Sequence, residues 1–200
     1  MLKFMGKVIV GIDLAAKSEN PTGWALWKDN VIKTTLMYDD EEILKEVTKT
    51  SPDIIAIDAP LTLPKKGLFR KADVELIKTG YRVFPPGLPS MRLLTLRAME
   101  INRLIAERGI KTIEVHPTST RKALSMPLKN PREVQKVFEE LGLNGSLKER
   151  LLTAHEIDAI TAALTAYLYL AGLTEIFGDE EEGYIVVPRR INWRTLKHGK

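Results

Sequence analysis

Two short runs of β-branched apolar residues, each ending near an aspartate, constrain the fold of this chain more than any other feature. Residues 7–14 read KVIVGIDL and residues 53–58 read DIIAID, so Asp13 and Asp58 lie at the ends of two predicted buried strands. The segment 39–49 between them has the apolar spacing of a helix. Because a helix between two strands implies a crossover, the strands should be parallel and both aspartates should lie at one sheet edge.

Three further strands are predicted, at 22–27, 31–37 and 111–116. The first two are separated by a short turn and should form an antiparallel meander with the first strand of the chain. Residues 182–187 read EGYIVV and fit either a last strand or an ordered tail. We therefore predict an α/β fold with a mixed five-stranded sheet, an antiparallel meander plus parallel strands, flanked by helices at 39–49, 71–78, 91–108, 119–125, 131–141 and 151–173.

The chain length of 200 residues suits one domain, predicted to span 1–200. Residues 59–90 form a connection longer than a fold of this kind needs, rich in proline and in Lys and Arg, which is typical of a functional loop. Residues 189–200 are basic and contain no acid, and we interpret them as a solvated tail.

The amino-acid composition limits which cellular compartments suit this protein. The absence of cysteine excludes disulfides and thiolate metal sites and fits a reducing cytoplasm. Residues 1–10 are too short for a signal peptide, and the apolar run 159–173 is too short and too polar to span a bilayer. We expect a soluble, cytoplasmic protein without a membrane partner. The oligomeric state is not indicated, although the run Tyr167–Leu170 is available for a subunit interface.

Four acidic residues occupy positions that favour a metal site. Asp13 and Asp58 end strands, Glu114 lies inside the third buried strand, and Asp158 lies in an alanine-rich helix. Acids brought together beside a buried sheet repel one another, and a hard cation such as Mg²⁺ or Mn²⁺ relieves that repulsion. Each position alone also has a structural interpretation, since aspartate favours turns at strand ends, but together they predict a divalent-metal site.

Two histidines accompany these acids. His155 precedes Asp158 by three residues and shares its helical face, where it is a candidate to orient the carboxylate, bind a phosphate or transfer a proton. His116 ends the third buried strand before Pro117, where a structural hydrogen bond and a substrate contact are equally plausible. We count His155 with the catalytic candidates and His116 with the substrate-binding candidates.

The long loop supplies candidates for binding a polyanion. Arg70, Arg82 and Arg92 are predicted to contact substrate phosphates, with a hydrated surface loop as the alternative. Tyr81 and Phe84 suit base stacking, although apolar anchoring of the loop to the core is the simpler interpretation.

Several motifs in order resemble the domain-of-unknown-function family 429, which is described as predicted nucleases of the RNase H-like superfamily. They span nearly the whole chain: GIDLA (11–15), TGWAL (22–26), IAIDAPL (55–61), GYRVFPPGLPSMR (80–92), EVHPTSTRKAL (114–124), HEIDAITAALTA (155–166) and EEGYIVVP (181–188). The resemblance implies the RNase H-like fold. It also implies that Asp13, Asp58 and Asp158 take the superfamily's places for metal-binding acids on the first strand, the fourth strand and the C-terminal helix, with Glu114 as a fourth.

The function that follows is metal-dependent hydrolysis of phosphodiester bonds, with nucleic acid (RNA, DNA or a hybrid) as substrate and Mg²⁺ or Mn²⁺ as cofactor. Two alternatives remain open at this point. One is a phosphotransferase or phosphohydrolase of small molecules on the same fold, although no glycine-rich phosphate loop is present. The other is a non-catalytic module that binds a metal or a partner, because fold does not determine function.

Overall fold

The computed structural model describes residues 6–198, and its centre is a mixed sheet of eight strands. The strands are arranged in the order β6-β3-β2-β1-β4-β5-β8-β7. Their bounds are β1 (Val8–Asp13), β2 (Thr22–Lys28), β3 (Val31–Met37), β4 (Ile54–Asp58), β5 (Lys111–Val115), β6 (Asn144–Gly145), β7 (Thr174–Asp179) and β8 (Gly183–Pro188).

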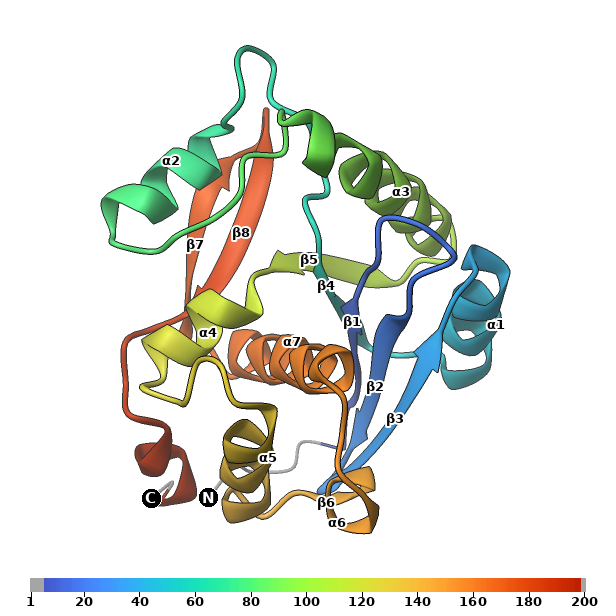
Figure 1. Cartoon of the computed structure of the whole chain (residues 1–200), viewed down its shortest axis with the longest axis vertical. Helices are drawn as coiled ribbons and strands as arrows, with labels where there is room; N and C mark the ends of the chain where they lie inside the picture. The colour runs from blue at the N-terminus through green and yellow to red at the C-terminus, as the bar shows by residue number, and fades with distance from the viewer. Residues whose placement is uncertain (1–5, 199–200) are drawn as a thin grey trace.

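Helices cover both faces of this sheet (Figure 1). They are α1 (Asp40–Thr50), α2 (Lys71–Lys78), α3 (Pro89–Ala106), α4 (Pro117–Ala123), α5 (Pro131–Glu140), α6 (Ser146–Glu149) and α7 (Ala154–Leu170), followed by the 3₁₀ helix η1 (Trp193–His198). The predicted α/β architecture is confirmed. So are the antiparallel meander of β1, β2 and β3 and the parallel pairing of β4 with β1 and β5.

The predicted number of strands was wrong, because the sheet has eight strands and not five. The segment 182–187, which fitted either a strand or an ordered tail, lies in strand β8. This strand pairs parallel to β5 and antiparallel to β7. The strand β7 lies at the sheet edge with side chains that are exposed or half-buried, so it lacks the apolar alternation by which a strand is recognised. The strand β6 has only two residues.

Alternation along the central strands divides the core into two layers. Ile9 and Ile54 face the layer that contains α5 and α7, whereas Val10 and Ile55 face the layer that contains α1 and α3. Strands buried on both faces read as continuous apolar runs, which explains why β1 and β4 are so clear in the sequence. Asp13 and Asp58 are the polar last residues of these two strands.

Two glycines let α7 lie directly on the sheet. A Cβ at Gly11 would stand 2.0 Å from the carbonyl oxygen of Ala159, and one at Gly23 would stand 2.1 Å from that of His155. Any side chain at these positions would push α7 away from β1 and β2. The close approach brings the first turns of α7 next to the end of β1, where Asp13 lies.

The C-terminal segment differs from the solvated tail that we predicted. The backbone N–H groups of Ile191 and Trp193 donate to Ala123 and Leu124, and the Trp193 side chain is buried. An apolar anchor inside a basic segment accounts for this packing; residues 199–200 and 1–5 lie outside the described part of the chain. Among residues 6–198 no helix combines the length and apolar character needed to cross a bilayer.

The first half of the run Tyr167–Leu170, considered for a subunit interface, packs within the protein itself. The Tyr167 ring stacks on Trp27 with centroids 5.1 Å apart and an angle of 7° between the planes, and Leu168 is fully buried. Tyr167 and Leu168, in the last turn of α7, therefore belong to the core, whereas Leu170 is exposed.

Candidate active site

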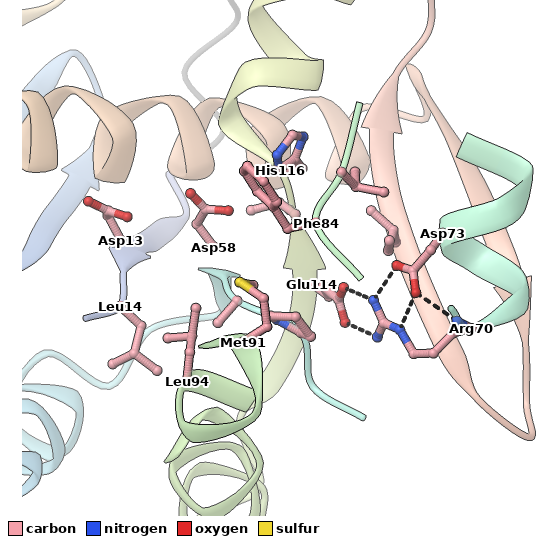
Figure 2. Close-up of a pocket in the computed structure, with 15 residues that line it drawn as sticks. Asp13, Leu14, Asp58, Arg70, Asp73, Phe84, Met91, Leu94, Glu114 and His116 are labelled. Carbon is pink, nitrogen blue, oxygen red and sulfur yellow. Dashed lines mark hydrogen bonds and ion pairs between the residues drawn. The ribbon is translucent and has the colours of Figure 1, made fainter. Parts of the chain in front are cut away.

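Asp13 and Asp58 are the last residues of β1 and β4 and stand in register as direct neighbours across the parallel pair. They line one pocket of about 210 Å³ together with Glu114, His116 and Phe84 (Figure 2). The sequence prediction that strand ends bring these two aspartates to one sheet edge is thus matched by the geometry.

The start of α7 fixes His155 beside this pair. Thr153 caps the helix and forms a reciprocal capping box with Glu156, whose carboxylate also accepts hydrogen bonds from Arg150 and Thr34. Burial raises the pKa of Glu156, but these hydrogen bonds outweigh burial and lower the pKa to about 2. With the first turn held in this way, the Nδ1 atom of His155 lies 2.7 Å from Oδ2 of Asp13.

Asp158 joins the site from the next turn of α7, but its carboxylate is engaged. Oδ1 of Asp158 accepts a hydrogen bond from Nη1 of Arg121, an α4 residue whose side chain is 7% exposed. Sequence analysis missed Arg121. It lies inside the motif 114–124, but a single arginine beside Lys122 in a short polar helix gives no sign of burial.

Burial, and after it repulsion between carboxylates, disfavours the charged forms of Asp13 and Asp58. Burial, together with the charge of Asp158, raises the pKa of Asp13 to about 6 against the opposing effects of His155 and Arg121. Burial, followed by the charges of Asp13 and Asp158, raises the pKa of Asp58 well above its usual range. Carboxylates that crowd one another in this way favour binding of a proton or another cation.

The roles predicted for Glu114 and Arg70 need correction, because the two side chains form an ion pair with each other. Nη1 and Nη2 of Arg70 lie 2.7 and 2.5 Å from the two carboxylate oxygens of Glu114, and Asp73 accepts two further hydrogen bonds from the guanidinium (Figure 2). Thr62 accepts another from Nη1. Glu114 also accepts from the Leu61 N–H at 2.8 Å. Glu114 is therefore not free to act as the predicted fourth metal ligand. Arg70, 1% exposed, is not free to take a substrate phosphate.

His116 lines the pocket in its neutral form. Burial, and after it the charge of Arg121, lowers the pKa of His116 to about 4. Its Nδ1 lies 2.8 Å from Oγ of Ser119 in the first turn of α4. This is the structural hydrogen bond weighed for His116, and the substrate contact remains a prediction.

The long loop divides into anchoring and exposed residues. Tyr81 is buried at 3% exposure, as expected of an anchor, whereas Phe84 is 74% exposed although it lines the pocket. Arg82 in the loop and Arg92 in the first turn of α3 are exposed as well. The exposed positions suit contact with a polyanion and the buried ones do not.

Among the described residues, Asp13 and Asp58 lack a third metal ligand beside them in this arrangement. Within the described part of the chain, no three His, Asp or Glu side chains are grouped closely enough to hold a metal ion. Asp13 and Asp58 supply the oxygen ligands that Mg²⁺ and Mn²⁺ prefer. The third carboxylate, Asp158, is turned to Arg121 and lines a separate hollow of about 60 Å³.

Comparisons with known proteins agree with this architecture. Solved structures that resemble the chain include RuvC of T. thermophilus in complex with a Holliday junction substrate (TM-score 0.53, 18% identity, covering 83% of this chain and 96% of that one). They also include the Thermus thermophilus RuvC structure (TM-score 0.46, 20% identity, 82% and 96%). The first likeness supports the predicted RNase H-like fold. No curated protein matches the chain in sequence.

A family model described as "Protein of unknown function (DUF429)" matches residues 11–183. That interval includes Asp13, Asp58, Asp158 and both buried arginines. Since it covers most of the sequence, the chain belongs to the DUF429 family.

Proposed function

We propose that the protein hydrolyses phosphodiester bonds of nucleic acid with the help of a divalent metal ion. The observation that carries the proposal is the in-register pair Asp13 and Asp58, both with raised pKa values, beside Asp158 and His155 at the start of α7. The likeness to RuvC, which was captured with a Holliday junction, supports this reaction class by analogy of fold.

The carboxylate oxygens of these residues are of the type that a hard cation prefers. Asp13 and Asp58 would hold Mg²⁺ or Mn²⁺, and Asp158 would join them once its carboxylate is free. A bound ion of this type supplies positive charge for phosphate oxygens and lowers the pKa of a bound water. Glu114 contributes indirectly, because its ion pair with Arg70 joins the loop 59–90 to β5 below the pocket.

The chain's own residues have distinct tasks in this proposal. His155, held through Nδ1 by Asp13, keeps Nε2 for exchange of a proton with water or a phosphate oxygen. Arg82 and Arg92 are exposed and would neutralise phosphates along the nucleic-acid backbone. Phe84, exposed at the pocket rim, would stack on a base.

The pocket volume favours a polymer over a small nucleotide. Pockets that enclose small ligands usually measure about 300–1,000 Å³, whereas this one measures about 210 Å³. A site of this size accommodates one phosphate group of a chain that passes across the surface. The small-molecule phosphohydrolase is accordingly the weaker candidate.

Cleavage assays test the proposal directly. The purified protein is incubated with single-stranded, duplex, RNA–DNA hybrid and four-way junction substrates in Mg²⁺ or Mn²⁺. We expect at least one substrate to be cut, and the Asp13→Asn variant to lose at least about 100-fold in rate because both the ligand and the partner of His155 change.

Glu41→Gln is the matched control, because Glu41 is an exposed acid on α1. It should cut at the wild-type rate. Undiminished cleavage by Asp13→Asn would reject the assignment, and absence of cleavage of every substrate would favour a non-catalytic binding module.

A further inference from the structure

Arg121 is a buried cation that lacks a full set of partners. Its guanidinium pairs with Asp158, while its Nε atom, within the described residues, is buried without a hydrogen-bond partner. Buried guanidinium groups normally satisfy their N–H donors, because an unpaired polar group away from water destabilises the fold. The free donor therefore indicates a ligand or a second arrangement that this state does not include.

Several charged side chains surround Arg121 and indicate its electrostatic role in the structure. From α7, Asp158 contacts it, and from the ends of β1 and β4 the charges of Asp13 and Asp58 act on it. On its own side, His116 at the start of α4 is also within its electrostatic reach. Arg121 thus supplies positive charge to the same three carboxylates that would hold a divalent ion.

Release of Asp158 requires little rearrangement. The Asp158 side chain is 28% exposed, so water can solvate it when the ion pair opens. A guanidinium with an unused Nε–H can meet a phosphate through two parallel hydrogen bonds, which an ion pair with one carboxylate oxygen does not use. An incoming phosphodiester can therefore compete with Asp158 for Arg121.

We infer that Arg121 competes with the divalent metal for Asp158 and releases it when a phosphodiester group arrives, so that metal and substrate bind with positive coupling. The inference rests on the proposed function and deepens it by stating how the site is completed. Coupling between two sites in proteins commonly amounts to about 5–150-fold in affinity, and we expect at least about tenfold here.

Calorimetric titration with Mn²⁺ alone tests the competition without any need for catalysis. Arg121→Gln should bind Mn²⁺ at least about tenfold more tightly than the wild type, because Asp158 is then free to join Asp13 and Asp58. Arg121→Lys keeps a charge but loses the planar contact, and it should tighten binding by a smaller factor in the same direction. It also serves as the test variant if Arg121→Gln does not fold, as judged by circular dichroism.

The same titration with saturating dimethyl phosphate, which presents a phosphodiester anion and nothing else, tests the coupling. We expect dimethyl phosphate to tighten Mn²⁺ binding by the wild type at least about tenfold, relative to a chloride solution of equal ionic strength. In Arg121→Gln it should tighten binding by a clearly smaller factor, because only the direct contact between phosphate and metal remains. Equal Mn²⁺ affinity of the wild type and both variants, with or without the phosphodiester, would overturn the inference while the proposed function stands. Absence of Mn²⁺ binding by every form of the protein would overturn both.

Discussion

Arg70 and Arg121 are both buried arginines paired with carboxylates, yet their surroundings differ. Arg70 is 1% exposed, and its three nitrogens donate to Asp73, Glu114 and Thr62. Arg121 is 6% exposed and contacts Asp158 through one nitrogen, with Nε left unpaired. Arg70 belongs to the long loop, where it precedes α2, and Arg121 lies on α4.

The contrast teaches how to tell a structural buried charge from one available for function. A buried ion pair that satisfies every donor and acceptor holds its surroundings in one arrangement. Such a pair resists exchange, because any new partner must replace several hydrogen bonds at once. An incompletely paired charge beside partly exposed carboxylates can change partners with a much smaller loss of hydrogen bonds. Arg70 belongs to the first kind and Arg121 to the second.

The largest expected effect is on stability, from Arg70→Met. Removal of the guanidinium leaves Glu114 and Asp73 buried without their cation, and we expect a loss of about 3–5 kcal/mol in the free energy of unfolding. Urea denaturation measures it. Arg103→Met is the matched control, because Arg103 pairs with Glu100 and Glu107 on the exposed face of α3. It should change stability little, and equal losses in both variants would contradict the comparison.

Next in size is the pH dependence caused by His116. The unfolded chain takes up the histidine proton below its ordinary pKa of 6.5, whereas the folded protein takes it up only near pH 4. The contribution of neutral His116 to stability is therefore complete above pH 6.5 and falls by about 3 kcal/mol as the pH drops from 6.5 to 4.

The raised pKa values of Asp13 and Asp58 act in the opposite direction, so the wild type alone does not isolate this effect. The difference in stability between the wild type and His116→Asn should shrink or change sign as the pH falls through this window. A difference that stays constant from pH 7 to pH 4 would show that His116 is not held neutral.

A smaller loss, about 1–2 kcal/mol, is expected for Arg121→Met. Asp158 can be solvated when its partner is removed, which Glu114 cannot. Urea denaturation under the same conditions as for Arg70→Met makes the two values directly comparable. A loss as large as that of Arg70→Met would place Arg121 among the structural charges.

The exposed arginines should leave stability unchanged and alter only binding. Arg82→Ala and Arg92→Ala should each lower the slope of log affinity against log salt for nucleic-acid binding by about 1. Fluorescence anisotropy with a labelled DNA duplex at several salt concentrations measures the slope. Arg132→Ala, an exposed arginine on α5, is the control and should keep the wild-type slope. An unchanged slope in both the Arg82→Ala and the Arg92→Ala variants would exclude these residues from the interface.

Local sequence determined much of this molecule by itself. The β-branched runs that end at Asp13 and Asp58 identify two central parallel strands, because only a strand covered on both faces is apolar throughout. The alanines of α7 indicate close packing on the sheet, and α2 occupies the predicted bounds Lys71–Lys78. The spacing of apolar residues and the residues that begin and end helices and strands are local properties, so neighbouring residues reveal them.

Only the tertiary structure decided which charges are free and which are paired. Arg70 and Glu114 are 44 residues apart in sequence, and Arg121 and Asp158 are 37 apart. An arginine in a basic loop looks the same in the sequence whether it faces water or a buried carboxylate. The edge strand β7 was hidden for a related reason, since its pairing with β8 and not its own pattern makes it a strand. Partners distant in the chain are set by packing, and packing decides which acids and bases remain available for chemistry.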